Sequence, residues 1–143
     1  MRQAKKSGIL VDANKIRENI NPISEKLQPR IIHGELQDMY YMFRTNRQSL
    51  FNIAIKTFIK SVKSDGIDNV VIAVPRRKDC LNSTNEINKV IQNELLGDVL
   101  ESIEGFDTTF KLGAKVMQTV NDYGKNVFNG EIGYVTKISE RYD

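Results

Sequence analysis

The sequence has few of the residues on which catalysis and covalent cross-linking depend. Its 143 residues include one cysteine, Cys80, and one histidine, His33. These counts exclude an internal disulfide and a Cys/His zinc site. There is no G-x-x-x-x-G-K-[ST] motif, and no carboxylate pair or nucleophile–base pair stands at a recognisable spacing. The chain by itself is a poor enzyme candidate, and we expect His33 to be a loop residue rather than a catalyst.

Long apolar runs are also absent. No run approaches the roughly 18 residues needed to span a membrane, and the apolar patch near the N-terminus is too short for a signal peptide. We therefore expect a soluble, cytoplasmic protein without a membrane partner. The net charge of +3 and pI of about 9.0 are mildly basic, which is compatible with a phosphate-bearing partner.

Apolar residues at helical spacing predict three helices. Ser7 and Ser83 are expected N-caps of the first and third, and Gly66 is expected to end the second. The predicted helices span residues 7–20, 45–66 and 83–96.

Between the helices, two short runs have strand character. Residues 38–43 are rich in aromatic side chains, and residues 69–74 (NVVIAV) form a continuous run typical of a strand buried on both faces. The order strand, helix, strand, helix predicts an α/β fold with a parallel sheet. After Gly97, alternating runs at 115–120 and 131–138 predict a small antiparallel unit, so a boundary is placed near 97–110.

Three basic clusters are candidate sites, and each has a plainer structural interpretation. The N-terminal cluster around Arg2 and Gln3 is either an anion contact or a solvated terminus. Arg76, Arg77 and Lys78 follow the predicted buried strand, and the free N–H groups and hydroxyls of Ser83 and Thr84 would add an anion site there; the alternative is a solvated turn. The third cluster belongs to the predicted hairpin, whose mixture of amides, lysines and an aromatic ring suits single-stranded nucleic acid, unless it is only a polar tip. Its members are Lys115, Gln118, Asn121, Tyr123, Lys125 and Asn129.

The hairpin segment FKLGAKVMQTVNDYGKNVFNGEIGYV resembles F-x-V-G-D-K-V-M-Q-x-x-N-x-Y…V-F-N-G-D-I-G of RecD-like superfamily 1 DNA helicases, which include the exodeoxyribonuclease V alpha subunit. Two further segments are similar in the same order. RQAKKSGILVDANKIRENINP resembles the segment that carries helicase motif IV, and STNEINKVIQ resembles S-T-x-x-L-N-x-x-I-Q, with Asn88 at the family's asparagine.

This resemblance implies that residues 1–97 are part of the second RecA-like motor domain. Residues 98–143 would be a linker and the start of a small SH3-like β-barrel, and Walker A and B would lie outside this chain. Arg2, with Gln3 beside it, would reach the γ-phosphate of ATP, with ATP and Mg²⁺ bound in the full-length parent and neither in this fragment. Single-stranded or double-stranded DNA would be the partner, together with the rest of the helicase chain and other subunits of a nuclease–helicase complex.

In that parent, the chain would contribute to ATP-dependent 5′-to-3′ translocation and unwinding in DNA recombination and repair. The alternative is a stand-alone module that binds single-stranded nucleic acid without ATPase activity. A third interpretation is a protein-interaction scaffold. The DNA contacts implied by the resemblance are backbone contacts, without base readout. They fall on Arg76, Arg77, Lys78, Ser83, Thr84, Asn88, Lys115, Gln118, Asn121 and Tyr123.

Overall fold

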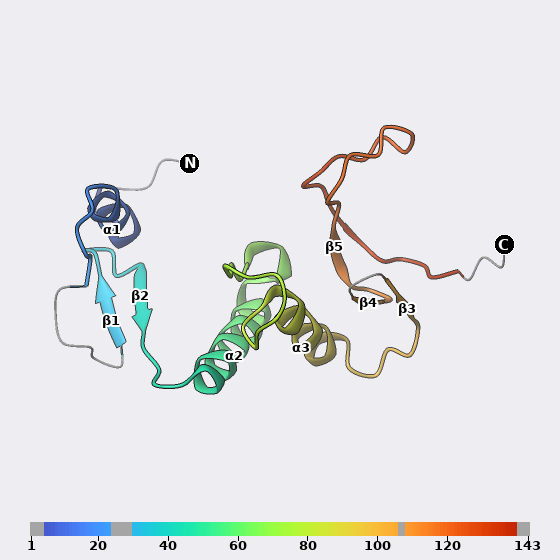
Figure 1. Ribbon diagram of the computed structural model, residues 1–143, viewed down its shortest axis with the longest axis horizontal. Coiled ribbons are helices and arrows are strands. Elements are labelled where there is room, and N and C mark those ends of the chain that lie inside the picture. Colours follow the sequence, from blue (N-terminus) through green and yellow to red (C-terminus); the bar gives the residue numbers. More distant parts are fainter. Residues whose placement is uncertain (1–4, 24–29, 106–107, 140–143) are drawn as a thin grey trace. The chain divides into compact units, whose positions relative to one another are not determined.

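The computed structural model describes residues 5–23, 30–105 and 108–139 (Figure 1). The chain divides into two compact units, Met1–Leu50 and Phe51–Asp143. Among the described residues, no helix combines the length and the apolar character needed to cross a membrane.

The first unit is built on helix α1, Gly8–Arg17, which begins where the sequence predicts and ends before the predicted Ile20. Ser7 is its N-cap by position, but its side chain makes no capping bond to the helix. Instead, Asp38 accepts a hydrogen bond from the N–H of Gly8 at 2.7 Å. The Ser7 hydroxyl, and after it the Gly8 N–H, hold the pKa of Asp38 below its usual value of 3.8. A carboxylate distant in sequence therefore stabilises the positive end of this helix.

Strands β1, Arg30–His33, and β2, Met39–Met42, form an antiparallel pair in the first unit. The strand predicted over residues 38–43 is confirmed by β2. The structure corrects the loop assignment of His33, which lies at the end of β1 opposite Met39. Gly34 follows with a φ of 81°, a left-handed conformation that glycine adopts without a steric penalty. Pairing across such a short connection costs less loop-closure entropy than pairing with a distant strand.

Two helices make the core of the second unit. Helix α2, Arg47–Asp65, agrees with the prediction, and Gly66 ends it with a φ of 82°. Helix α3, Thr84–Leu96, is capped as predicted, because the Ser83 hydroxyl accepts a hydrogen bond from the Glu86 N–H at 3.4 Å. The helices pack through three buried residues, Phe51, Ile55 and Ile87. The apolar stripes read from the sequence are therefore the core-facing sides.

Residues 70–74 are not the doubly buried strand that their composition predicts. They follow the 3₁₀ turn η1, Ile67–Asn69, and belong to no strand, and Val71 is 86% exposed while Val74 packs on the core cluster. The described residues accordingly contain no parallel sheet; their three sheets are antiparallel pairs. β-propensity alone does not make a strand, because a strand also needs a neighbour for its backbone hydrogen bonds.

The predicted antiparallel unit after Gly97 is present. Strand β3, Ser102–Glu104, pairs with β4, Thr109–Lys111, and β5, Lys115–Met117, pairs with β6, Ile132–Tyr134. The β3–β4 pair lies outside the two runs from which the unit is predicted. The two pairs form separate sheets, and no closed barrel is present among the described residues. The division between units falls at Leu50, whereas the boundary at residue 97 stays a prediction from the sequence.

Side-chain contacts attach this β unit to the helical part. The Gln92 side-chain amide on α3 donates to the Thr109 carbonyl at 2.8 Å and accepts from the Lys111 N–H at 2.9 Å. The Gln92 side chain thus forms hydrogen bonds with one backbone carbonyl and one backbone N–H of β4. On the other pair, Asp68 accepts from the Tyr134 hydroxyl at 2.5 Å and lies 2.9 Å from the Lys115 ammonium. These contacts position the hairpin that carries the candidate site.

Candidate nucleic-acid interface

The β5–β6 hairpin continues beyond its named strands. The Gln118 N–H donates to the Glu131 carbonyl and the Gly130 N–H donates to the Gln118 carbonyl, both at 2.9 Å. The Glu131 N–H donates to the Phe128 carbonyl at 3.1 Å, and Gly130 has a φ of 92°. A positive φ at the third residue of a four-residue turn requires glycine or asparagine. Asn129 and Gly130 therefore form a tight turn, as an Asn-Gly pair between two strands favours.

The residues between β5 and this turn form a second, smaller hairpin. Asp122 and Val127 exchange both backbone hydrogen bonds, at 2.8 and 3.0 Å, and Asn126 has a φ of 54°. Asn121 fixes the small hairpin to the turn, because its side-chain oxygen accepts from the Asn129 N–H at 2.8 Å. What looks like excess length in the sequence is an ordered tip with its own ladder.

This tip exposes an aromatic ring. Tyr123 is 77% exposed, and its ring meets Phe128 edge to face with centroids 6.1 Å apart. The Asn121 amide donates to the Tyr123 hydroxyl at 3.2 Å. Despite these two contacts, most of the Tyr123 surface remains accessible to solvent. An exposed ring held on a rigid tip suits stacking on a base.

The hairpin lysines carry compensated charge. Lys125 lies 3.3 Å from Asp122, and its N–H and ammonium hold the pKa of that carboxyl below the usual 3.8. Lys115 is only 24% exposed, and its ammonium contacts Asp68 at 2.9 Å and the Ile67 carbonyl at 3.0 Å. The Tyr134 hydroxyl, and then Lys115, lower the pKa of Asp68. Lys115 therefore holds the hairpin in place and offers little charge to a phosphate.

The other predicted amide contacts on the hairpin are also engaged within it. The Gln118 side-chain amide donates to the Val120 carbonyl at 2.6 Å. Asn121 bridges the turn and the tip, as described above. Of the four hairpin residues predicted to touch DNA, Tyr123 is the one that offers a large exposed surface, and Gln118, Asn121 and Lys115 support it.

The basic loop before α3 is exposed, and its backbone closes the helix N-terminus. The carbonyls of Arg76 and Arg77 accept from the N–H groups of Thr84 and Asn85 at 2.9 and 3.1 Å. With the Glu86 N–H bonded to Ser83, the first three helical N–H groups all have partners. The N–H groups of Ser83 and Thr84 are therefore not free, because the carbonyls of Cys80 and Arg76 accept from them, whereas the predicted DNA contact of these two residues stays a prediction.

The side chains around this helix start divide into two kinds. Ser83 is fully buried as a cap, and the Thr84 hydroxyl donates to the Arg76 carbonyl at 3.2 Å. Thr84 is nevertheless exposed, and so are the other predicted contact residues Arg76, Arg77, Lys78 and Asn88. Arg2 and Gln3, the predicted ATP contacts, lie outside the described residues.

Sequence reasoning missed a buried polar cluster in the first unit. Asp12 is 2% exposed, and one of its carboxylate oxygens accepts from the Tyr41 hydroxyl at 3.0 Å and lies 2.8 Å from Nδ1 of His33. The His33 and Tyr41 rings meet edge to face at 5.3 Å. The sequence held one indication that Asp12 is buried. It lies four residues after Gly8, so the two residues share one face of the predicted helix. Its partners on β1 and β2 follow only from the strand pairing.

One known protein family matches the C-terminal part of the chain. Residues 87–143, less than half of the sequence, match the family described as the ATP-dependent RecD-like DNA helicase SH3 domain. Neither the curated proteins nor the solved structures contain a match. The matched region begins in α3 and includes both strand pairs and the folded tip. The segment that presents Tyr123 is thus similar to the SH3 domain of RecD-like DNA helicases.

Proposed function

We propose that this chain is part of an ATP-dependent RecD-like DNA helicase and that its hairpin contacts single-stranded DNA. The family match over residues 87–143 carries the proposal. The resemblance of the preceding segments to motif IV and to the S-T-x-x-L-N motif supports the origin of residues 1–97 in a motor domain. In this role the chain serves 5′-to-3′ translocation, and the parent carries the nucleotide-binding motifs.

In this proposal the hairpin tip and the basic loop make different contacts with DNA. The face of Tyr123 stacks on a base, and Lys115, Gln118 and Asn121 hold the tip that presents it. Because the hairpin lysines are paired with carboxylates, the phosphate contacts come from the basic loop, residues 76–78, with Asn88 beside it. Ser83 and Thr84 shape this loop through the helix cap.

The two elements predict different responses to salt. Stacking on Tyr123 contributes about 1–3 kcal/mol, so Tyr123→Ala should weaken binding of a dT20 oligonucleotide roughly 5- to 150-fold without changing the salt slope. Arg76→Ala and Arg77→Ala should each reduce the slope of log K against log salt by about 1. Fluorescence anisotropy between about 50 and 200 mM NaCl measures both quantities.

A matched control is available on the first unit. Tyr40 is also an exposed tyrosine, at 48%, and lies on β2. Tyr40→Ala should leave dT20 affinity unchanged. Equal losses for Tyr40→Ala and Tyr123→Ala would contradict stacking at the tip, and an unchanged salt slope in both arginine variants would contradict the loop contacts.

We propose that ATP is hydrolysed by the parent helicase. The described residues hold no cluster of three or more His, Cys, Asp or Glu side chains suited to a metal ion, and no P-loop occurs in the sequence. Mg²⁺ and the ATP phosphates would therefore be held by the rest of the parent. Arg2, with Gln3, is proposed to reach the γ-phosphate and stabilise the charge that develops during phosphoryl transfer.

This role of Arg2 has its own test. In a parent polypeptide that contains the chain, Arg2→Ala should abolish DNA-stimulated ATP turnover and leave dT20 binding largely intact. A parent without DNA-stimulated ATPase would refute the helicase assignment. If the 143-residue chain nevertheless binds dT20 with micromolar affinity, the second candidate, a stand-alone nucleic-acid-binding module, is supported instead.

A further inference from the structure

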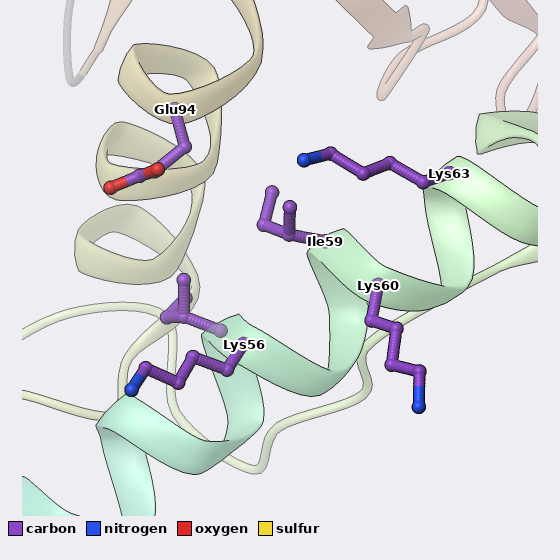
Figure 2. A pocket seen from close by; sticks show the side chains of 6 residues that line it. Lys56, Ile59, Lys60, Lys63 and Glu94 are labelled. Carbon is purple, nitrogen blue, oxygen red and sulfur yellow. The ribbon is translucent and has the colours of Figure 1, made fainter.

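A groove between α2 and α3 lies apart from the hairpin and the basic loop. It has a volume of about 400 Å³ and is lined mainly by α2, with one residue from α3. Figure 2 shows Ile59 between the helices, with Lys56 and Lys63 reaching toward α3 and Lys60 pointing away from it. The lining residues are Ile55, Lys56, Ile59, Lys60, Lys63 and Glu94.

The floor of the groove is aliphatic. Ile55 belongs to the buried core cluster and Ile59 packs against it, so both are held in place by the core beneath them. No aromatic ring lines the groove. Nucleic-acid bases bind preferentially on aromatic or guanidinium faces, and a phosphate backbone has no apolar surface to bury on isoleucine. This floor suits an aliphatic side chain.

The rim of the groove is cationic. Lys56, Lys60 and Lys63 are exposed, and no ion pair joins them to the described residues. Lys56 and Lys63 are separated by seven residues, which is about 10.5 Å along a helix at 1.5 Å per residue. They flank the apolar floor at its two ends. Two carboxylates about two helical turns apart, with an aliphatic residue between them, would match this spacing.

The opposite wall contributes a single negative charge. Glu94 is exposed on α3 and can accept a hydrogen bond from a backbone N–H or a basic side chain. A uniformly anionic chain would meet this carboxylate, whereas a helix or strand with one acidic face would place it against a donor. The charge arrangement therefore favours a peptide over a polyphosphate.

We propose that this groove binds an acidic amphipathic peptide segment of a partner protein. Its aliphatic side chains would rest on Ile55 and Ile59, and its carboxylates would pair with Lys56 and Lys63. The mode is that of a short segment laid in a groove, with apolar anchors giving contact area and flanking charges setting orientation. This surface is independent of the proposed DNA contacts.

The test uses the full 143-residue chain and three fluorescein-labelled probes. The first is a 12-residue amphipathic peptide. One face carries two glutamates two helical turns apart, with two isoleucines one helical turn apart between them, and the other face carries glutamine and lysine. The second is the same peptide with both isoleucines replaced by serine, and the third is a dT12 oligonucleotide. We expect the first peptide to bind about tenfold more tightly than the second, because each buried aliphatic side chain adds apolar contact.

Charge reversals locate the site. Lys56→Glu and Lys63→Glu should each weaken binding of the isoleucine peptide about tenfold, since each replaces an attraction with a repulsion. Lys89→Glu is the matched control, because Lys89 is exposed on α3 and does not line the groove. It should leave peptide affinity within about twofold. None of these lysines belongs to the buried core, so the variants should keep the helical circular dichroism of the parent chain.

Several results would overturn the proposal. Equal affinity for the isoleucine and serine peptides would show attraction by charge without a groove. Competition by unlabelled dT12, together with equal loss of dT12 binding in Lys56→Glu, would assign the groove to nucleic acid. Self-association of the chain in sedimentation that Lys56→Glu abolishes would assign it to a second copy. If Lys56→Glu and Lys89→Glu weakened peptide binding equally, the peptide would not bind in the groove.

Discussion

Asp12→Ala tests whether the buried polar cluster organises the first unit. The substitution removes the acceptor of the His33 and Tyr41 contacts, at 2.8 and 3.0 Å. Hydrogen bonds to a charged group contribute about 1.5–3 kcal/mol each. Against this stands the second Asp12 oxygen, which is buried without a hydrogen-bond partner among the described residues and has only the Lys15 ammonium at 3.8 Å.

These opposing effects set the expected magnitude. The two contacts contribute roughly 3–6 kcal/mol together, and burial of an unsatisfied polar atom costs about 1–3 kcal/mol. The net loss on Asp12→Ala should therefore be about 2 kcal/mol, or a change of roughly 30-fold in the opening equilibrium. Asp12→Asn keeps the shape and one acceptor oxygen but loses the charge. Its loss of stability should therefore lie between zero and that of Asp12→Ala.

Hydrogen exchange followed by mass spectrometry measures the opening equilibrium of each segment separately. Peptides that cover α1 should exchange about 30-fold faster in Asp12→Ala, while peptides that cover α3 should be unaffected. Asn14→Ala, on the exposed side of the same helix, is the control and should change little. Unchanged or slower exchange of α1 in Asp12→Ala would mean that the desolvation cost exceeds the contacts, and it would refute the reasoning.

Two further predictions concern backbone fit and pH. Gly8→Ala should destabilise the first unit by about 2 kcal/mol, because an added Cβ would lie 2.4 Å from the His33 carbonyl oxygen; Gly133→Ala, with nothing within 4 Å, is the matched control in urea unfolding. The Asp68 hydrogen bond raises the pKa of Tyr134 above 10.0, so its stabilisation is fully present below pH 10.0 and is lost as pH rises through the higher folded-state pKa. The difference in unfolding free energy between the parent chain and Tyr134→Phe should accordingly shrink above pH 10.0; a constant difference from pH 8 to 12 would contradict it.

Local signals in the sequence predicted the elements whose stability is mostly local. Helices α2 and α3 follow from apolar stripes of three to five turns, and Ser83 caps α3 through a residue three positions away. The turn at Asn129–Gly130 follows from the need for a positive φ. In each case the deciding interactions lie within a few residues, where spacing and residue type are sufficient.

Strand pairing could not be predicted in the same way. Residues 70–74 have the composition of a strand and are not one, whereas Arg30–His33 and Ser102–Glu104 are strands that the sequence pattern does not predict. The hydrogen bonds of a strand are made with another segment, so its identity depends on which segment lies beside it. The same dependence explains the tip of the hairpin, whose inner ladder appears only once Asp122 and Val127 are paired.

The sequence by itself determined the helices, the helix cap, the position of the hairpin turn and the likeness of residues 87–143 to a helicase SH3 domain. The tertiary structure decided which polar groups are available. It assigned Lys115 to Asp68, Asn121 to the turn, and the N–H groups of Thr84 and Asn85 to the basic loop, and it left the ring of Tyr123 exposed. The reason is physical: residue type fixes what a side chain can bind, and only the folded neighbourhood fixes whether a partner within the chain already occupies it.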